Sequence, residues 1–322
     1  MVGAATALAA ALTLSLTAAP STSAATERGT STITLVSYNA GAKVSVARSM
    51  WDLEEIIRRV DPDIISLQEM SNGEKRQQIR KTYLCDTCEW DAYMPGNYPE
   101  YVDGDAVKAG TPLLYRSDRL ELEAAGTEQV TERTYVGDAG AGPRWIQPKY
   151  VNWVRLRDQR SQRLVHVFNN HTVPSVQGRN GGPNRSMTER LGIYRKHMTG
   201  LQELIRGLTA DGPLGLSFVT GDLNVNYRRD KVLQPALFPY RRLGNVGMRA
   251  NWSALGEPRI GTHTLDNGNG TRLIDYVYFT PQRSLTPSRQ RILRGMYSDH
   301  RPVSVSFEVK NRWLTTEEPA TP

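Results

Sequence analysis

The sequence predicts an α+β sandwich of antiparallel strands and surface helices, and two observations carry this prediction. After about residue 31, many short apolar segments rich in β-branched residues are separated by turn residues, a pattern typical of strands. Only a few longer segments show the spacing of an amphipathic helix. Many strands with few helices between them favour packed sheets covered by helices. With 322 residues, 39% of them hydrophobic, the chain can form one large β-rich domain.

The first half of the chain combines one clear helix signal with several strand signals. Residues 49–60 carry apolar side chains at helical spacing, and Asp61-Pro62 follows as a stop signal, so we expect a helix there. A polar turn between the last two strands predicts an antiparallel hairpin. The strands predicted in this half cover residues 32–38, 63–68, 111–115, 150–157 and 163–169.

The second half begins with the strongest helix signal of the chain. Ser186-Met187-Thr188-Glu189 has the spacing of a capping box, in which the Ser oxygen and the Glu carboxylate each accept from an unpaired amide. Apolar residues then continue on one face from Tyr194 to Leu208, and Gly212 follows. Further strands are predicted over residues 216–220, 272–279 and 303–309.

The two ends of the chain differ in composition from the rest. Residues 1–25 carry no charge, are rich in Ala and Leu, and end in small residues, so we expect a signal peptide and a secreted protein. No Lys or Arg precedes the apolar run, and a retained membrane anchor is the alternative. We expect no stable anchor, because the run is short and interrupted by hydroxyl residues. Residues 312–322 form a polar tail.

Cys85 and Cys88 are the two cysteines of the chain. In an exported protein this spacing predicts a short-loop disulfide that closes a surface turn. A redox site would be expected at the start of a helix in a βαβ unit, and zinc would need two more soft ligands nearby.

The charge balance favours a polyanionic partner without choosing one. Lys and Arg total 40 against 33 acidic residues, a formal net charge of +7. Nucleic acid, anionic lipid headgroups and cell-wall polymers all fit such a surplus.

Polar residues stand at the ends of several predicted strands, where a fold alone would not require them. Two packed sheets whose strand ends converge would gather these side chains in one cleft. Carboxylate and amide oxygens can hold a hard cation, and a histidine oriented by a carboxylate can move protons near neutral pH. Phosphate-ester hydrolysis needs such a set. The residues are Asn39, Glu69, His171, Asp222, Asn224, Asp275, Asp299 and His300.

The order of these motifs resembles the endonuclease/exonuclease/phosphatase superfamily. The chain carries Tyr-Asn, Leu-Gln-Glu, Asn-x-His, Gly-Asp-x-Asn, Ile-Asp-Tyr and Ser-Asp-His in the order of that family. Each motif is weak by itself, but their order and spacing form a specific signal. The resemblance covers residues 31–311 and implies a catalytic domain with a four-layer α/β/β/α sandwich of two packed, mainly antiparallel sheets.

The resemblance also implies the metal-binding part of the site. Glu69 would be a principal metal ligand, with Asn39 and Asp299 close by. Oxygen ligands favour Mg²⁺ or Mn²⁺, and Ca²⁺ is also compatible.

The catalytic roles follow from the same resemblance. Asp222 and Asn224 would orient the attacking water and the phosphate. Asp275 would hold His300, which would bond the phosphate or act as a general base. His171 would face His300 and stabilise the transition state or protonate the leaving oxygen.

The remaining histidines carry less weight. His166 alternates along a predicted strand and is expected to be packed or on the surface. His197 is expected to face solvent on its helix. His263 is expected to be a loop residue, and contact with the site is the alternative.

We expect nucleic acid to be the substrate. We also expect the protein to be a monomer. Basic residues follow three of the motifs, where loops could grip phosphates. The candidates for substrate binding are Asn169, Arg179 and Arg185, with further basic residues at Lys75, Arg76, Arg80, Lys81, Arg228 and Arg229.

Three alternatives to a nuclease have sequence requirements of their own. A sphingomyelinase would need an exposed aromatic hairpin, and residues 96–101 offer tyrosines without a Trp/Phe cluster. A phosphoinositide or inositol phosphatase would carry a Trp-Cys-Asp-Arg segment where Leu273-Ile274-Asp275-Tyr276 stands. An inactive binding module would lack one of His171, Asp222 or His300, and all three are present.

Overall fold

The computed structural model describes residues 29–85, 87–95, 108–137, 143–209, 215–264 and 271–311. The predicted signal peptide (1–25), the polar tail (312–322) and the tyrosines of 96–101 lie outside these residues. Among the described helices, none has the length and apolar character needed to cross a bilayer.

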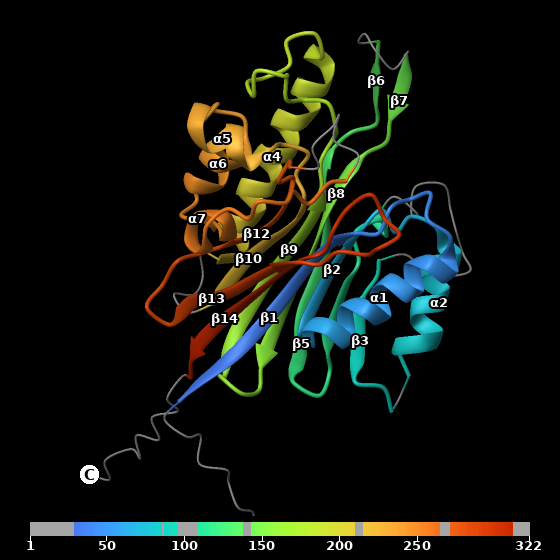
Figure 1. Cartoon of the computed structure of the whole chain (residues 1–322), viewed down its shortest axis with the longest axis vertical. Coiled ribbons are helices and arrows are strands. Elements are labelled where there is room, and N and C mark those ends of the chain that lie inside the picture. The colour runs from blue at the N-terminus through green and yellow to red at the C-terminus, as the bar shows by residue number, and fades with distance from the viewer. Residues whose placement is uncertain are drawn as a thin grey trace, which may run out of the picture. The chain divides into compact units, whose positions relative to one another are not determined.

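Two sheets of six strands each form the centre of the described chain (Figure 1). In spatial order, the first sheet contains β13 (Leu285–Ile292), β14 (Val303–Lys310), β1 (Thr30–Asn39), β2 (Ile64–Gln68), β4 (Leu113–Arg116) and β3 (Trp90–Tyr93). The second contains β11 (Arg249–Ala250), β12 (Asp275–Phe279), β10 (Leu216–Asp222), β9 (Arg163–His171), β8 (Lys149–Asp158) and β5 (Leu120–Thr131). A separate ribbon pairs β6 (Thr134–Val136) with β7 (Arg144–Ile146).

Each sheet contains one parallel pair, β1–β2 and β9–β10, and its other pairs are antiparallel. The helices cover the outer faces, with α1 and α2 on one side and α4 to α7 on the other (Figure 1). Their bounds are α1 Val46–Val60, α2 Gly73–Tyr83, α4 Thr188–Thr209, α5 Tyr227–Leu233, α6 Pro239–Gly244 and α7 Asn251–Leu255. The predicted α+β sandwich is confirmed.

The central strand β1 shows why its sequence is almost continuously apolar. Ile33 and Leu35 pack in the core between the sheets, whereas Val36 and Tyr38 pack on the opposite face among residues of α1. Because side chains alternate along a strand, a strand buried on both faces needs apolar residues at successive positions.

The predicted helix after β1 is confirmed and begins at Val46, earlier than expected. It ends where predicted. Asp61 takes a left-handed conformation with φ of 42°, its amide donates to the Ile57 carbonyl at 2.9 Å, and Pro62 follows. Proline removes the next amide donor, so the helix cannot continue.

The capping box predicted for α4 is wrong. The helix begins at Thr188, after Ser186. The Ser186 hydroxyl donates to Asn184 Oδ1 at 2.8 Å, and the Glu189 carboxylate accepts from the Gly137 amide at 2.6 Å. Glu189 therefore ties the start of α4 to the end of β6.

A disulfide joins Cys85 and Cys88 in the turn that follows α2. The Cys88 amide also donates to the Cys85 carbonyl at 2.8 Å. The bond closes a surface turn, as the spacing predicts.

Candidate active site

Strand register brings the polar strand ends of both sheets to one place. In the first sheet, Asn39 at the end of β1 pairs with the residue before Glu69. In the second, Asp222 at the end of β10 pairs with His171 on one side and with Asp275 on the other. Asn39 Nδ2 donates to Asp222 Oδ2 at 3.2 Å, which joins the two sheets at this edge.

The backbone is strained at this edge. Glu69 and Asn224 have positive φ angles of 59° and 53°, a conformation that non-glycine residues adopt rarely and that clusters at functional sites. Gly221 has φ of 139°, and a Cβ there would lie 1.9 Å from the Asn170 carbonyl oxygen. Glycine is therefore required directly before Asp222.

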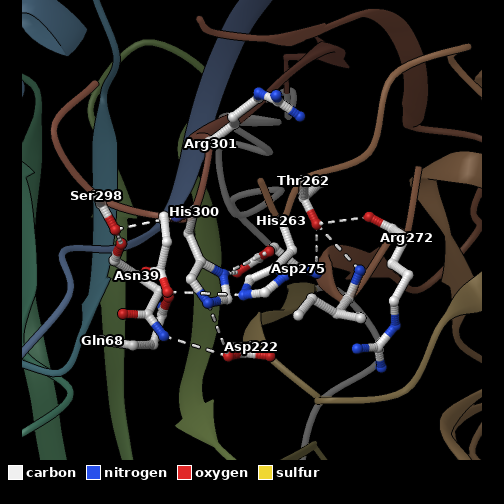
Figure 2. A network of polar contacts seen from close by, with 12 residues as sticks. Asn39, Gln68, Asp222, Thr262, His263, Arg272, Asp275, Ser298, His300 and Arg301 are labelled. Carbon is white, nitrogen blue, oxygen red and sulfur yellow. Dashed lines mark hydrogen bonds and ion pairs between the residues drawn. The ribbon is translucent and has the colours of Figure 1, made fainter. Parts of the chain in front are cut away.

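His300 is held between two carboxylates (Figure 2). Its Nδ1 lies 3.1 and 3.0 Å from the two carboxylate oxygens of Asp275, and its Nε2 lies 3.7 Å from Asp222 Oδ2. Its amide donates to Ser298 Oγ at 3.1 Å, and that hydroxyl donates to the Asn39 carbonyl at 2.7 Å. The predicted pair of Asp275 and His300 is thus in contact.

These contacts set the charge of His300. Burial by itself lowers the pKa of this imidazole, but the carboxylates of Asp275 and Asp222 outweigh burial and raise the pKa to about 10. Burial raises the pKa of Asp222 to about 6, against the opposing effect of His300. At neutral pH, His300 is therefore a cation that can donate a hydrogen bond or a proton.

His171 faces the same carboxylate in the opposite protonation state. Its Nε2 lies 3.5 Å from Asp222 Oδ2 and 3.9 Å from Glu69 Oε1. Burial, followed by the charges of Lys149 and His300, holds the pKa of His171 well below its usual value. Asp222 thus lies between a cationic and a neutral imidazole.

Lys149 belongs to the site and is absent from the residues predicted for it. It is the first residue of β8, and burial lowers its pKa while the carboxylates of Asp222 and Glu69 oppose that effect. With Glu69, His171 and Tyr150 it lines a cavity of about 250 Å³. No motif marks this lysine among the 40 basic residues of the chain, because the strand pairing alone brings it here.

Glu69 presents carboxylate oxygens that suit a hard divalent cation. Its Oε2 accepts from the Ala42 amide at 2.5 Å, and its Oε1 accepts from Asn39 Nδ2 at 3.3 Å. Asn39 Oδ1 accepts from the Gly41 amide at 3.0 Å. Asn39 therefore positions Glu69 through its amide nitrogen, while its own oxygen bonds the Gly41 amide instead of facing the metal that Glu69 would bind.

His263 lies at the site. The expectation of an ordinary loop residue is therefore wrong, and the alternative, contact with the site, is confirmed. It forms a β-bridge with His300, and the two rings lie 4.8 Å apart in an edge-to-face arrangement (Figure 2). Its Nε2 lies 3.7 Å from Asp299 Oδ2, and its hydrogen bond lowers the pKa of that carboxyl. Asp299 is therefore ionised and remains an available oxygen ligand.

Asn169 does not have the position expected of a substrate-binding residue. Its side chain is fully buried, its Nδ2 donates to the carbonyls of Leu67 and Pro112 at 2.8 and 3.0 Å, and its Oδ1 accepts from Gln68 at 2.8 Å. Asn169 therefore joins the two sheets, which corrects the prediction.

Two of the basic residues predicted to grip phosphates are buried instead. Lys75 Nζ donates to the Gly41 carbonyl at 2.7 Å, and Arg76 donates to the Met70 carbonyl. They hold the loops around Glu69 and do not reach a cleft surface.

The prediction for His197 is wrong. Its ring is fully buried, and its Nε2 lies 3.2 Å from Asn170 Oδ1. Burial lowers its pKa to about 3. His166 is also buried, with a pKa lowered to about 4 by burial and then by Arg155.

A basic cleft opens from the catalytic centre. Its volume is about 560 Å³, and its walls include Asn224, Asn226, His263, His300, Arg179, Arg229 and Arg272. Arg179 and Arg229 are exposed, and no ion pair joins either to another described residue. Arg185 is exposed but lies outside the lining of this cleft.

The sequence matches the model of the endonuclease/exonuclease/phosphatase family over residues 36–300. No curated protein matches it.

Solved structures share the fold at low sequence identity. A mannosyl-6-phosphatase from Bacteroides thetaiotaomicron is 16% identical with a TM-score of 0.60, and the match covers 85% of this chain and 99% of that one. TDP2 from D. rerio, in complex with a single-stranded DNA product, is 12% identical with a TM-score of 0.58, covering 86% and 99%. The catalytic domain of human Nocturnin is 15% identical with a TM-score of 0.58, covering 86% and 94%.

Proposed function

The chain belongs to the endonuclease/exonuclease/phosphatase family, and from that premise we propose that it is a divalent-metal-dependent phosphodiesterase that cleaves nucleic acid. Members of the family are phosphoric ester hydrolases that depend on a divalent metal, and this chain is such a hydrolase. The proposal concerns the substrate, the ion and the roles of individual residues.

The observation that carries the proposal is the pair of histidines on either side of Asp222. The buried Asp222 carboxylate accepts hydrogen bonds from the Asn224 amide at 2.9 Å and from Asn39 Nδ2 at 3.2 Å, which fix its orientation. We assign to this carboxylate the role of orienting a water molecule and accepting a proton from it. His300, protonated at neutral pH, donates to a phosphoryl oxygen and offsets its charge. His171, neutral, bonds the opposite side of the same phosphate.

Glu69 and Asp299 are the residues that we assign to the metal, with Asn39 positioning Glu69. Both carboxylates are partly exposed and offer the hard oxygen ligands that Mg²⁺ and Mn²⁺ prefer. The bound ion would offset negative charge on the phosphoryl group.

The basic cleft favours nucleic acid over a small phosphomonoester. Arg179 and Arg229 extend the positive surface beyond His300, where further phosphates of a polymer would lie. The single-stranded DNA product bound by one structural neighbour supports this assignment. Because another neighbour is a mannosyl-6-phosphatase, a sugar phosphate is the second substrate class to be assayed.

Export is a further part of the proposal. The uncharged N-terminal segment supports a mature start near Ala25 or Thr26, and the bond between Cys85 and Cys88 suits an oxidising compartment. Amino-terminal sequencing of the native protein checks this, and retention of residues 1–20 would contradict it.

A substrate panel tests the activity. Purified protein with Mg²⁺ is assayed on single-stranded DNA, plasmid DNA, RNA, sphingomyelin, phosphoinositides and mannose 6-phosphate, each with and without excess EDTA. We expect cleavage of nucleic acid that EDTA abolishes. Full activity after exhaustive chelation would contradict the requirement for a divalent metal. Turnover of a lipid or sugar phosphate, with DNA and RNA left intact, would contradict nucleic acid as the substrate.

A further inference from the structure

The short ribbon of β6 and β7 presents two large aromatic side chains to solvent. Tyr135 and Trp145 are cross-strand partners, and each is 51% exposed. Their rings lie 5.3 Å apart in an edge-to-face arrangement. The Arg133 guanidinium lies 4.4 Å from the centre of the Trp145 ring. No contiguous aromatic cluster marks this pair in the sequence, because Tyr135 and Trp145 are ten residues apart and are brought together by pairing across the ribbon.

The ribbon is anchored so that this aromatic face points outward. Val136, next to Tyr135, is fully buried in the larger hydrophobic core, and Ile146, next to Trp145, packs against that core. The Gly137 amide donates to the Glu189 carboxylate at the start of α4. Because side chains alternate along a strand, anchoring one face holds the other in solvent.

The ribbon leads directly into the catalytic centre. Three residues follow Trp145 before Lys149, a distance of at most about 13 Å along an extended chain. Figure 1 shows β6 and β7 projecting beyond the sheets at the end where β8 begins. Gln147 and Pro148, between the two, line the same cavity as Glu69.

We propose that Tyr135 and Trp145 form a stacking platform for the bases of a single-stranded nucleic acid whose scissile phosphate lies beside Lys149. This inference rests on the proposed nuclease activity and names the part of the site that holds the strand outside the cleft. Exposed aromatic rings flanked by arginines are the means by which proteins bind unpaired strands without sequence preference. Arg133, which lies over the Trp145 ring, supplies a charge that complements phosphates.

The composition of the ribbon favours nucleic acid over a membrane. The sequence between the strands, residues 137–143, reads Gly-Asp-Ala-Gly-Ala-Gly-Pro and so offers no large apolar side chain for insertion into a bilayer. The two aromatic residues belong to the strands themselves, beside the exposed Arg133. One nearby acid, Glu132, lines the groove between β5 and α4 instead.

The test separates strand binding from chemistry. Binding of a fluorescein-labelled 12-nucleotide oligo-dT is measured by anisotropy in EDTA, and hydrolysis of bis(p-nitrophenyl) phosphate, which is too small to reach the ribbon, is measured with Mg²⁺. We expect Trp145→Ala to weaken oligonucleotide binding about tenfold, the effect of losing one stacked base. Hydrolysis of the small ester should not change.

Matched variants guard against misfolding and general effects. Trp145→Phe keeps a ring and should bind almost normally, and Tyr135→Ala gives a second loss of ring area. Trp51→Ala removes a tryptophan that is 41% exposed and also packs edge-to-face on a tyrosine, Tyr297, but lies on α1. It should leave binding unchanged.

The outcomes distinguish the inference from the proposed function. Normal binding by both Trp145→Ala and Tyr135→Ala, or an equal loss in Trp51→Ala, overturns the platform while the nuclease assignment stands. Wild-type protein that hydrolyses the small ester but neither binds nor cleaves oligonucleotides overturns the nuclease assignment. Flotation of the wild type, but not of Trp145→Ala, with phosphatidylserine vesicles would assign the ribbon to a membrane instead.

Discussion

Opposite protonation of two histidines is the main feature of the site at the scale of single residues. Asp275 and Asp222 stabilise the cation of His300, whereas burial and Lys149 keep His171 neutral. A single phosphate placed between them would meet a charged donor on one side and a neutral ring on the other. The contact of Asp275 with His300 is predicted from the motifs, whereas the effect of Lys149 on His171 is not.

The pair of Asp275 and His300 gives the first prediction. His300→Ala should lower kcat/KM by about 10²–10⁴-fold, the usual contribution of a positioned proton donor. Asp275→Asn removes the carboxylate that raises the pKa of His300. The alkaline fall in activity, set in the wild type by a pKa of about 10, should therefore move to lower pH. A pH–rate profile on bis(p-nitrophenyl) phosphate measures both effects.

The control for this prediction is Glu308→Gln, which neutralises an exposed carboxylate in β14 away from the site. Its profile should match the wild type. An unchanged alkaline limb in Asp275→Asn would show that His300 does not act as the cation.

Lys149 gives a second prediction. A cation beside Glu69, Asp222 and His171 can bind a phosphoryl oxygen, and a hydrogen bond to a charged group contributes roughly 1.5–3 kcal/mol. Lys149→Ala should therefore lower kcat/KM at least about tenfold, and Lys149→Arg should retain more activity. Loss of Lys149 also removes a charge that lowers the pKa of His171, so the acid limb should move to higher pH.

Steady-state kinetics over a pH series measures both effects of Lys149, and Lys310→Ala, an exposed lysine at the end of β14, is the control. Wild-type kinetics in Lys149→Ala would remove this residue from the site.

Secondary-structure elements explain which parts of the site can be predicted from sequence. The polar residues at strand ends are predictable from the sequence. A strand pattern that ends in a polar residue such as Asp222 can be recognised without knowledge of the tertiary structure. Lys149 is brought to the site by the pairing of β8, and His263 by its β-bridge with His300. These contacts join residues far apart in the sequence, so no local pattern predicts them.

Helical spacing predicts the burial of His197 better than its polarity does. His197 lies at helical spacing from Tyr194 and Leu201, so it shares the buried face of α4. The polarity of a side chain is a weaker guide than its position on the helix.

The same residue gives a prediction for α4 about stability. Unfolded histidine takes up a proton near pH 6.5, whereas His197 in the folded chain does so only near pH 3. The unfolded state therefore binds more protons below pH 6.5, and stability should fall as the pH drops from 6.5 toward 3. His166, with a pKa of about 4, adds to the effect. Each such group contributes a slope of up to about 1.4 kcal/mol per pH unit.

Urea unfolding at pH 7.5, 5.5 and 4.5 checks this. His197→Gln retains an amide that can bond Asn170 and does not titrate, so its stability should depend less steeply on pH than that of the wild type. Equal slopes in the two proteins would contradict the assignment.

Gly221 gives a prediction for the pairing of β9 and β10. A Cβ at this position would lie 1.9 Å from the Asn170 carbonyl oxygen, at the point where Asp222 and His171 are brought together. Gly221→Ala should therefore destabilise the protein by several kcal/mol, about the cost of severe strain at a special backbone position. Gly207→Ala, in α4 with open space around it, should be neutral or stabilise by up to about 1 kcal/mol. Thermal unfolding compares the two, and equal stability would contradict the geometry.

For the whole molecule, two sheets of six strands converge at one end, where Asn39 joins Asp222 across them. The net charge of +7 does not identify a partner by itself. The structure shows which basic residues can meet a substrate. Lys75 and Arg76 are buried, whereas Arg179 and Arg229 line the cleft. The substrate therefore meets a smaller set of basic residues than the sequence suggests.

That smaller set predicts how salt affects binding. If about four basic residues contact phosphates, the logarithm of the association constant for single-stranded DNA should fall with the logarithm of salt concentration with a slope of about −2.8. Arg179→Ala and Arg229→Ala should each reduce this slope by about 0.7, because each removes one phosphate contact. Anisotropy titrations of oligo-dT in EDTA over about 50–200 mM KCl measure the slopes. Arg58→Ala removes an exposed arginine that pairs with Glu55 on α1, outside the cleft, and should keep the wild-type slope. A slope near zero in the wild type would exclude phosphate contacts as the source of affinity. A wild-type slope in both cleft variants would instead place the contacts elsewhere on the basic surface.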